Sequence, residues 1–463
     1  MGMAGGGVSD PAPSEAAWYN PAALGGLKAG EVALGYTLLR THFEEFPPIQ
    51  WDTNVDGQVT DDDTPLDLGP EDGHYDGLQV GLAVPLGHRL GLGVSAFVPS
   101  DRLMRVSSVE PSLPDYLLYN RRLQRFELAV GLGAHVWKGL HLGAGLQLLA
   151  SAKVNVVGTL GLAVSGADEE DEDLSQLLSE TSLDVHTIDL DVYPELIPTL
   201  GGRWELGQLL PALRGWTLGG AWHGSGGLPV DTSVVLQGNV AATNLGELNP
   251  LVLGLNIPME LLFVDHYVPT QWSAGLSYEL RRKGRGRLAC AFAELRHTAW
   301  SAMVPSVANV TSGEIQSPLF QLQDPTISDA NAYELVLEDT LAPRVGAEVV
   351  PLSRETSGRL GRVALALRGG WGLEPSPLVS QGRGTAFLDA DRMIFAGGLG
   401  LRHADPFQAL GPYSWDLFVQ RHLLASGELQ APAETRAGAP VDGAPIPIGG
   451  HLWSAGLQWS FAY

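Results

Sequence analysis

An acidic segment, residues 52–63, carries oxygen-bearing side chains at the spacing that a cation site requires. Oxygen donors fall at positions one, three, five and twelve of the segment, with glycine at position six and an aliphatic residue at position eight. Ca²⁺ takes about six to eight oxygen ligands, and this is the spacing of EF-hand calcium loops, with aspartate replacing the usual glutamate at position twelve. We therefore predict a calcium site, with a solvated acidic turn as the alternative. The candidate ligands are Asp52, Asn54, Asp56, Gln58 (through its backbone carbonyl), Thr60 and Asp63.

The sequence contains no recognised motif of an enzyme. The 463 residues contain no G-x-S-x-G, H-E-x-x-H, P-loop or G-x-G-x-x-G motif, so we expect no enzyme and no cofactor besides calcium. The single cysteine, Cys290, excludes a disulfide framework and any metal site made of several cysteines. With 28 Lys and Arg against 52 Asp and Glu, the net charge is −24, which argues against a nucleic-acid partner.

The elements that must position these residues show a period of two. Apolar residues alternate with small or polar ones over residues 126–135, 140–148 and 272–280, among other segments. Successive side chains of a strand lie on opposite faces, so each segment is a predicted strand with one apolar face. The other face carries Gly, Ala and Ser with scattered Gln, Glu and His. Outer-membrane barrels have this pattern, with apolar residues toward lipid and small or polar residues toward the lumen.

The number of these segments predicts an all-β protein, a transmembrane up-and-down antiparallel β-barrel of about 14 strands in the bacterial outer membrane. Short connections follow the even-numbered segments and long polar loops follow the odd-numbered ones. We expect Glu127, Glu279 and Arg368 on inner faces, in ion pairs. The predicted strands lie near residues 31–39, 76–86, 90–99, 125–137, 140–160, 183–205, 216–237, 271–280, 287–303, 340–351, 361–373, 392–403, 414–427 and 449–463.

The last predicted strand has the sharpest alternation and ends on an aromatic residue. Trp453, Leu457, Trp459 and Tyr463 share one face, opposite small and polar residues. This resembles the C-terminal signal that the barrel-assembly machinery recognises during insertion. An ordinary amphipathic edge strand is the alternative.

The N-terminal residues do not have the pattern of a strand. Residues 1–30 combine a glycine-rich start with the stretch Trp18-Tyr19-Asn20-Pro21-Ala22-Ala23-Leu24, which predicts a compact irregular plug; a disordered tail is the alternative. The stretches GMAGGGV and WYNPAAL, followed by a barrel of about 14 strands, resemble the FadL family of outer-membrane transporters for long-chain fatty acids and other hydrophobic compounds. The triplet Asn20-Pro21-Ala22 matches the plug motif of that family.

The resemblance implies a division into residues 1–30, a plug or hatch inside the barrel, and residues 31–463, the transmembrane barrel with long external loops. It also implies passive transport: a hydrophobic molecule or fatty acid is captured outside, binds in the lumen and leaves sideways into the membrane. Residues 90–99, with Gly91, Gly93 and Pro99 as breakers of a regular ladder, are the best match for the kinked strand beside the lateral opening.

An apolar stretch is the candidate for the capture step. Residues 250–264 are expected in an external loop, and such loops rarely carry so much apolar surface unless it binds something. Burial of this stretch against neighbouring loops or lipid is the alternative. The candidate capture residues are Leu251, Leu253, Leu255, Ile257, Met259, Leu261, Leu262 and Phe263.

The charge distribution supports a second function. Acidic residues concentrate in two predicted external loops, residues 52–63 and 168–173, which leaves a weakly charged barrel. A FadL-like barrel that holds a surface protein partner through acidic, calcium-loaded loops is therefore the alternative to transport. A general porin for polar solutes is a third possibility, which the plug and the glycine-lined walls disfavour.

Overall fold

The computed structural model places most of the chain. It describes residues 2–52, 58–61, 63, 65–66, 73–101, 114–116, 118–119, 125–165, 178–226, 230–243, 251–263, 267–282, 286–303, 308–309, 314–316, 336–355, 362–379, 387–403, 411–430 and 441–463. Among these residues, no helix has the length and apolar character needed to cross a membrane.

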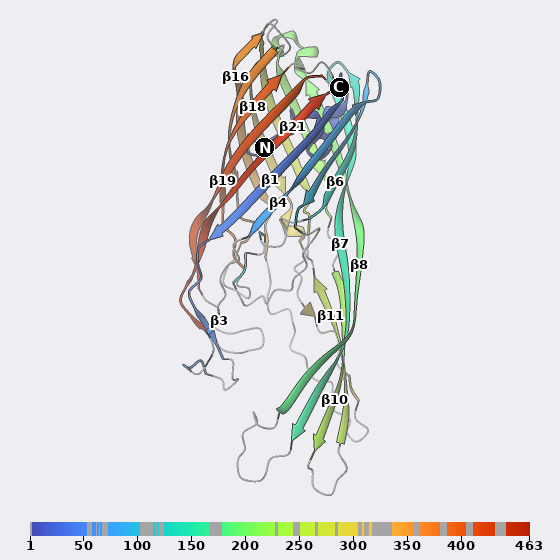
Figure 1. Ribbon diagram of the computed structural model, residues 1–463, viewed down its shortest axis with the longest axis vertical. Helices are drawn as coiled ribbons and strands as arrows, with labels where there is room; N and C mark the ends of the chain where they lie inside the picture. Colours follow the sequence, from blue (N-terminus) through green and yellow to red (C-terminus); the bar gives the residue numbers. More distant parts are fainter. Residues whose placement is uncertain are drawn as a thin grey trace.

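The chain forms a closed antiparallel barrel of 14 strands, as predicted (Figure 1). Each strand pairs with its neighbours along the sequence, and the ring closes where the first strand, β1, pairs with the last, β21. The last strand also pairs with β19, so it is not an edge strand. The barrel strands are β1 (Glu31–Phe43), β4 (His74–Pro85), β5 (Leu90–Pro99), β6 (Glu127–Trp137), β7 (Leu140–Ser165), β8 (Leu178–Glu205), β9 (Trp216–His223), β12 (Gln271–Arg282), β13 (Gly286–Thr298), β16 (Thr340–Glu355), β17 (Arg362–Glu374), β18 (Arg392–His403), β19 (Tyr413–Leu429) and β21 (Ile446–Ala462).

The two faces of the barrel wall follow the alternation in the sequence. On β6, Val130 and Leu132 are exposed on the outer face, whereas Ala129, Gly131 and Gly133, which alternate with them, are buried on the inner face. A ring of strands with apolar residues outside and paired backbone groups throughout is the arrangement that a bilayer permits.

The connections differ at the two ends of the barrel. Short turns join β4 to β5 and β6 to β7 at the end where the C-terminus lies, and the strand ends that flank the long connections lie at the opposite end (Figure 1). This asymmetry matches periplasmic turns and external loops, and it confirms the predicted alternation of short and long connections.

One predicted strand is wrong in its extent. Residues 216–237 were expected as a single strand, but β9 ends at His223, and β10 (Val230–Thr243) is a separate strand outside the ring of barrel strands. The run Gly224-Ser225-Gly226-Gly227 separates them, and Gly224 donates its N–H to the carbonyl of Pro198. Glycine imposes little preference on the backbone, so the strand can end there although the alternation of residue types continues.

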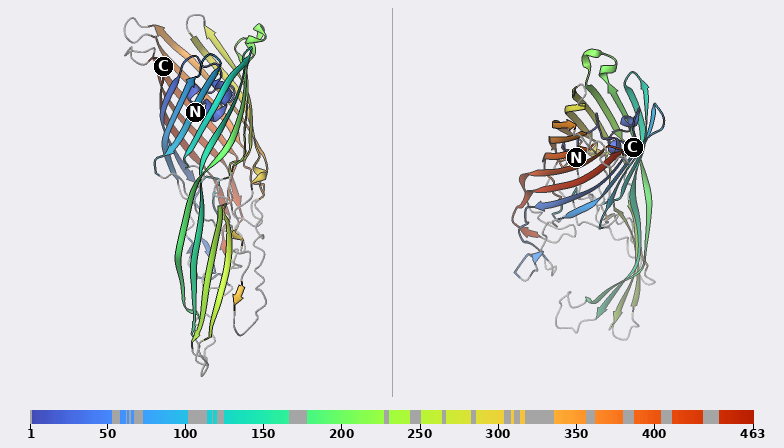
Figure 2. Two further views of the ribbon diagram at one scale, coloured as in Figure 1. Left: turned by 90° about the vertical axis from the view of Figure 1, so that its right-hand side faces the viewer. Right: turned by 45° about the horizontal axis from the view of Figure 1, so that its top comes forward.

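A sheet extends from one side of the barrel beyond the long-loop end (Figure 2). The strands β7 and β8 have 26 and 28 residues, against the roughly 9–11 that cross a bilayer. Their outer parts pair with each other and, through β7, with β10 and β11 (Leu251–Phe263). The short strands β14 (Ala308–Asn309) and β15 (Glu314–Gln316) pair with β11. We call the outer parts of β8 and β7 together with β10 and β11 the arm.

A small core packs at the long-loop end of the barrel. Phe43 at the end of β1 stacks on Tyr116, with ring centroids 4.0 Å apart. Burial raises the pKa of Tyr116 to about 12, so its neutral hydroxyl can donate to the carbonyl of Gly449 and accept from the N–H of the same residue. Beside this core, a three-stranded sheet joins β2 (Ile49–Trp51), β3 (Pro65–Leu66) and β20 (Val441–Gly443).

Candidate functional site

The N-terminal residues contact the inner faces of strands all round the barrel. They include three short helical turns, η1 (Pro13–Glu15), α1 (Ala16–Tyr19) and η2 (Pro21–Leu24). The backbone N–H of Gly7 donates to Glu294 on β13 at 2.8 Å, and Arg203 on β8 donates to the carbonyl of Ser9 at 3.1 Å. We refer to residues 2–30 as the N-terminal segment.

Asn20 holds the centre of this segment in place. Its side chain is fully buried, and its amide donates to the carbonyls of Val8 at 2.7 Å and Gly202 of β8 at 3.0 Å. Its carbonyl oxygen accepts from the N–H of Ala22 at 3.0 Å and caps η2, which begins at Pro21. Proline suits the first position of such a turn because it has no N–H to satisfy. The three residues of the predicted motif therefore act as one unit.

Glycines on the inner face make room for this unit. A Cβ atom at Gly201 would lie 2.1 Å from the side-chain oxygen of Asn20, and one at Gly143 would lie 2.3 Å from the backbone nitrogen of Ala22. Any larger residue would push the segment away from β7 and β8. Close approach of the backbone accounts for these glycines.

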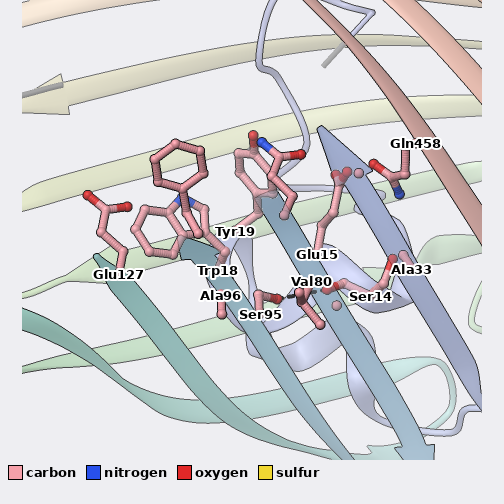
Figure 3. Close-up of a pocket in the computed structure, with 14 residues that line it drawn as sticks. Ser14, Glu15, Trp18, Tyr19, Ala33, Val80, Ser95, Ala96, Glu127 and Gln458 are labelled. Atoms are coloured by element: carbon pink, nitrogen blue, oxygen red, sulfur yellow. Dashed lines mark hydrogen bonds between the residues drawn. The ribbon is translucent and has the colours of Figure 1, made fainter. Parts of the chain in front are cut away.

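A mainly apolar cavity of about 320 Å³, which we call the wall cavity, lies between the N-terminal segment and the wall (Figure 3). Trp18 and Tyr19 line it from the segment, and Phe97 and Ala33 line it from the barrel. Ser95 on β5 donates to the carbonyl of Ser14 at 2.7 Å at its edge. The lining comes from η1, α1, β1, β4, β5, β6 and β21 and consists of Ser14, Glu15, Trp18, Tyr19, Ala33, Gly35, Gln79, Val80, Gly81, Ser95, Ala96, Phe97, Glu127 and Gln458.

A second space of about 120 Å³ lies beyond Trp18 and Tyr19. These two residues and Glu127 line both cavities, so the end of α1 separates them. The small cavity is more polar, since His223, Glu294 and other polar groups line it. Burial raises the pKa of Tyr19 to about 12, so its phenol remains neutral between the two spaces.

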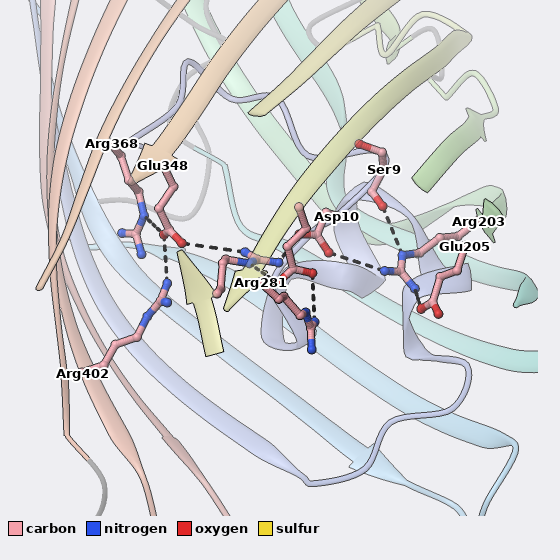
Figure 4. A network of polar contacts seen from close by, with 10 residues as sticks. Ser9, Asp10, Arg203, Glu205, Arg281, Glu348, Arg368 and Arg402 are labelled. Atoms are coloured by element: carbon pink, nitrogen blue, oxygen red, sulfur yellow. Dashed lines mark hydrogen bonds and ion pairs between the residues drawn. The ribbon is translucent and has the colours of Figure 1, made fainter. Parts of the chain in front are cut away.

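A third, charged cavity of about 500 Å³ borders the start of the segment and shares Glu15 and Gln458 with the wall cavity. An ion-pair network lines it and ties the segment to the barrel (Figure 4). Asp10 of the segment contacts Arg287 of β13 at 2.5 Å and Arg203 of β8 at 3.5 Å. Arg287 also contacts Glu279 at 2.8 Å, which confirms the predicted pairing of Glu279 inside the barrel.

Glu348 on β16 lies where the network branches. It is 2 % exposed, and it contacts Arg368 at 2.8 Å, Arg402 at 2.9 Å and Arg287 at 3.8 Å. Arg368 also pairs with Asp416. The predicted ion pairing of Arg368 is therefore confirmed, and its guanidinium is already engaged by two carboxylates.

The candidate calcium residues lie in the connection between β2 and β3. Asn54 and Asp56 fall outside the described residues. Asp52 and Asp63 are buried, and a side-chain oxygen of Asp63 accepts the N–H of Thr60 at 2.8 Å within a tight turn. No group of at least 3 His, Cys, Asp or Glu side chains is placed to hold a metal within the described part of the chain. The calcium site stays a prediction, and so does any role of residues 168–173, which are not described.

The candidate capture residues are placed differently from the prediction. Residues 251–263 form strand β11 of the arm instead of an irregular loop. Ladders to β10 on one side and to β14 and β15 on the other satisfy backbone groups that a loop would leave to water.

The cavity-lining aromatics were missed by sequence reasoning. Trp18 and Tyr19 directly precede the Asn20-Pro21-Ala22 motif, so the motif itself could have indicated them. Phe97 lies on the inner face of the predicted strand 90–99. It is an aromatic residue on a face of small residues, and this contrast in the sequence could have indicated it. Residues 90–99 pair with β4 and β6 without a register shift.

Together, the closed ring, its apolar outer face and the asymmetric connections define an integral β-barrel of the bacterial outer membrane. No protein-family model matches the chain, and no curated protein matches it in sequence. Its fold is similar to that of a FadL homologue from Pseudomonas aeruginosa, with a TM-score of 0.53 and 14% identity, over 98% of this chain and 95% of that chain. The predicted resemblance to the FadL family is thus confirmed at the level of the fold.

Two further solved structures are similar over nearly the whole chain. The Pseudomonas putida toluene transporter TodX has a TM-score of 0.48 and 13% identity, over 100% of this chain and 97% of that one. The Ralstonia pickettii toluene transporter TbuX has a TM-score of 0.43 and 13% identity, with the same coverage of 100% and 97%.

Proposed function

We propose that this barrel is a passive outer-membrane transporter of hydrophobic molecules, with long-chain fatty acids as the expected cargo. The wall cavity carries this proposal. It is about 320 Å³ in volume and lies between the N-terminal segment and the lipid-facing wall. Trp18, Phe97 and small residues line most of it, together with Glu15, Glu127 and two glutamines. Such a space suits an apolar ligand, and burial stabilises an acyl chain by about 0.8 kcal/mol per CH₂ group. The fold shared with a FadL homologue supports the same class of function.

The proposed route runs from the outside to the wall cavity and then sideways into the bilayer. The N-terminal segment serves as the plug that bars a straight aqueous path. Phe97 and Glu127 are the last pair of the ladder between β5 and β6, and both line the wall cavity. Pro99, two residues further on, has no N–H with which to extend a ladder. We place the lateral exit at this end of β5, in keeping with the kinked strand that the family resemblance implies.

Filling the wall cavity should block transport. Ala33 is buried and lines the cavity, so we expect Ala33→Phe to reduce uptake of a fluorescent long-chain fatty acid by at least tenfold. A tenfold change corresponds to a loss of about 1.4 kcal/mol of binding free energy. The measurement is the initial uptake rate in cells that carry the variant as their only transporter of this class. Ala144→Phe is the matched control because Ala144 is exposed on the outer face of β7. Equal uptake by Ala33→Phe and the control would contradict a role for this cavity.

The proposed capture of cargo at β11 can be tested in the same uptake assay. Replacing Leu261, Leu262 and Phe263 by serine should lower uptake at low cargo concentration more than at saturation, since capture raises the local concentration of cargo. Uptake that does not change at either concentration would remove the capture role.

We also propose that residues 52–63 bind calcium at the external face, between β2 and β3. The support is the ligand spacing together with the hairpin, because β2 pairs with β3 and brings the two ends of the loop close together. A ligand that binds only the folded loop stabilises it by about 2.7 kcal/mol at a hundredfold excess over its Kd. Calcium should therefore protect the β2–β3 hairpin from limited proteolysis.

The variant Asp56→Ala should abolish this protection. Asp61→Ala is its control, because Asp61 occupies position ten of the segment, which is not among the candidate ligands. Protection that persists in Asp56→Ala would contradict the site. Calcium-dependent retention of a surface protein by the intact barrel, with normal uptake in Asp56→Ala, would favour the scaffold function over a transport role for the loop.

A further inference from the structure

The described lining of the wall cavity carries negative charge and no positive charge. Its acidic residues are Glu15 and Glu127, and it contains no Lys, Arg or His. Two glutamines and two serines are its neutral polar members. In a mainly apolar space the field of a carboxylate is weakly screened. A charged head group that enters the wall cavity therefore meets a negative field.

Glu127 lines the wall cavity without a cationic partner beside it. It is the first residue of β6, it is half-buried, and it lines the small cavity as well. Among the described residues, its carboxylate has no hydrogen bond and no ion pair. The charge of Arg125 acts on Glu127, but Arg125 lines neither cavity. A carboxylate in an apolar space is costly unless it is paired, so a cationic ligand would supply the missing partner.

The arginine of the small cavity does not supply this partner. Arg296 donates to Glu294 at 3.2 Å and to the hydroxyl of Ser273 at 3.3 Å. Its charge is therefore neutralised on the wall of β13 itself, and no ion pair joins it to Glu127 within the part of the chain that the structure describes. The small cavity thus leaves Glu127 uncompensated from its own side.

Glu15, the second acid of the wall cavity, also borders the charged cavity. The four arginines that line the charged cavity each contact another carboxylate: Asp10 for Arg203 and Arg287, and Glu348 for Arg368 and Arg402. The side chain of Glu15 has no hydrogen bond or ion pair with any described residue. Its charge therefore adds to the negative field of the wall cavity.

Aromatic rings lie between the two acids. Glu127 and Glu15 are at opposite ends of the labelled side chains, with Trp18 and Tyr19 between them (Figure 3). Phe97 of β5 is the ladder partner of Glu127, and directly opposite residues on one face have Cβ atoms about 5 Å apart. The faces of aromatic rings attract cations, and cages of such rings recognise ammonium groups. Rings and carboxylates together make a surface that suits a positively charged head group with an apolar body.

We propose that the wall cavity binds a hydrophobic amine, with its protonated ammonium group against Glu127 and the aromatic rings. The apolar chain of the amine then lies along Trp18, Ala33 and Phe97. This inference rests on the proposed function, because it names a class of cargo for the same cavity. The acyl chain of a fatty acid fits the same apolar space, but a carboxylate head there would face Glu127 and Glu15 and be repelled. Among molecules with the same chain, the cavity prefers the amine to the alcohol and the alcohol to the carboxylate.

Three ligands that differ only in their head group test this order. Octylamine, octanol and octanoate are titrated calorimetrically at about pH 7 into the barrel in phosphatidylcholine nanodiscs, where the amine is protonated and the acid is ionised. Empty nanodiscs give the binding to lipid, which is subtracted. Octylamine should bind at least tenfold more tightly than octanoate, with octanol between them. Equal affinities, or tighter binding of octanoate, would overturn the proposal without the need for any variant.

Removal of one charge identifies the site. Glu127→Gln keeps the size of the side chain, so it should weaken octylamine binding at least tenfold and leave octanol binding unchanged. Glu45→Gln is the matched control, because Glu45 is exposed just beyond β1 and outside the described linings of the cavities. Heat-modifiable migration on a gel verifies that each barrel is folded. A folded Glu127→Gln barrel that binds octylamine as tightly as the control would overturn the proposal.

The variant Ala33→Phe separates the failure of this proposal from the failure of the transport proposal. Because it fills the wall cavity, it should weaken the binding of octylamine and of octanol alike. Octanol binding that ignores this variant would show that the wall cavity is not the cargo site, and both proposals would fall. Octanol binding that is lost in Ala33→Phe, with no preference for octylamine in the unaltered barrel, would overturn the amine class alone.

Discussion

Replacing Glu348 by glutamine should reduce the free energy of unfolding of the barrel by about 3–5 kcal/mol, as expected when one partner is removed from a buried ion-pair network. Glu348 is the shared partner of Arg368, Arg402 and Arg287. Glutamine has nearly the same size and can still accept a hydrogen bond, so the change removes the charge and little packing. The guanidinium groups then face one another with less neutralisation.

Urea unfolding of the protein in lipid vesicles, followed by tryptophan fluorescence, measures this loss. The control is Glu428→Gln, because Glu428 is exposed near the end of β19. An equal midpoint for the two variants would show that water or Asp416 neutralises the arginines and would contradict the network as a source of stability. A lower midpoint for Glu348→Gln alone is the expected outcome.

Replacing Asn20 by alanine should release the N-terminal segment from the barrel wall. The variant loses two donated hydrogen bonds and the cap of η2. At about 1 kcal/mol for each bond, the docked state loses about 3 kcal/mol, which corresponds to an approximately hundredfold rise in the undocked fraction. If the segment is the plug that we propose, this rise opens the lumen to small polar solutes.

Single-channel conductance in planar bilayers and liposome swelling with a small sugar both report this opening. Lys28→Ala is the control, since Lys28 is an exposed residue of the same segment. Asn20→Asp keeps an acceptor for the N–H of Ala22 but loses the amide donors, so its conductance should lie between those of the other two variants. A closed channel in Asn20→Ala would rule out a plug held by this residue.

The barrel could be predicted from the sequence because its determinants are local. The alternation of residue types along each strand indicates both the strand and its lipid-facing side, so the wall around Val130 and Leu132 was predictable. The Asn20-Pro21-Ala22 motif is likewise short, and its turn depends on contacts between neighbouring residues. In both cases the pattern and its structural consequence lie within one element.

The arm and the cavities could not be predicted in this way because they depend on distant pairings. The alternation that predicts β9 continues through β10, and the difference lies in their partners: β9 pairs with β8 and β12, whereas β10 pairs with β7 and β11. The apolar composition of β11 is compatible with a loop that binds cargo and with a strand of a sheet. The network at Asp10 likewise joins residues more than 190 positions apart, a separation that no local pattern encodes.

The ladder between β1 and β21 has a consequence for biogenesis. It joins the two parts of the barrel that lie furthest apart in the sequence, and the N–H groups of Gly30 and Tyr463 each donate to the other's carbonyl at its end. A chain that adds its strands in order completes this seam last, after closing a loop of more than 400 residues. The N-terminal segment is attached directly to one side of the seam. If it already lies on the inner side of the curving sheet when the seam closes, sealing the barrel and enclosing the segment are a single step.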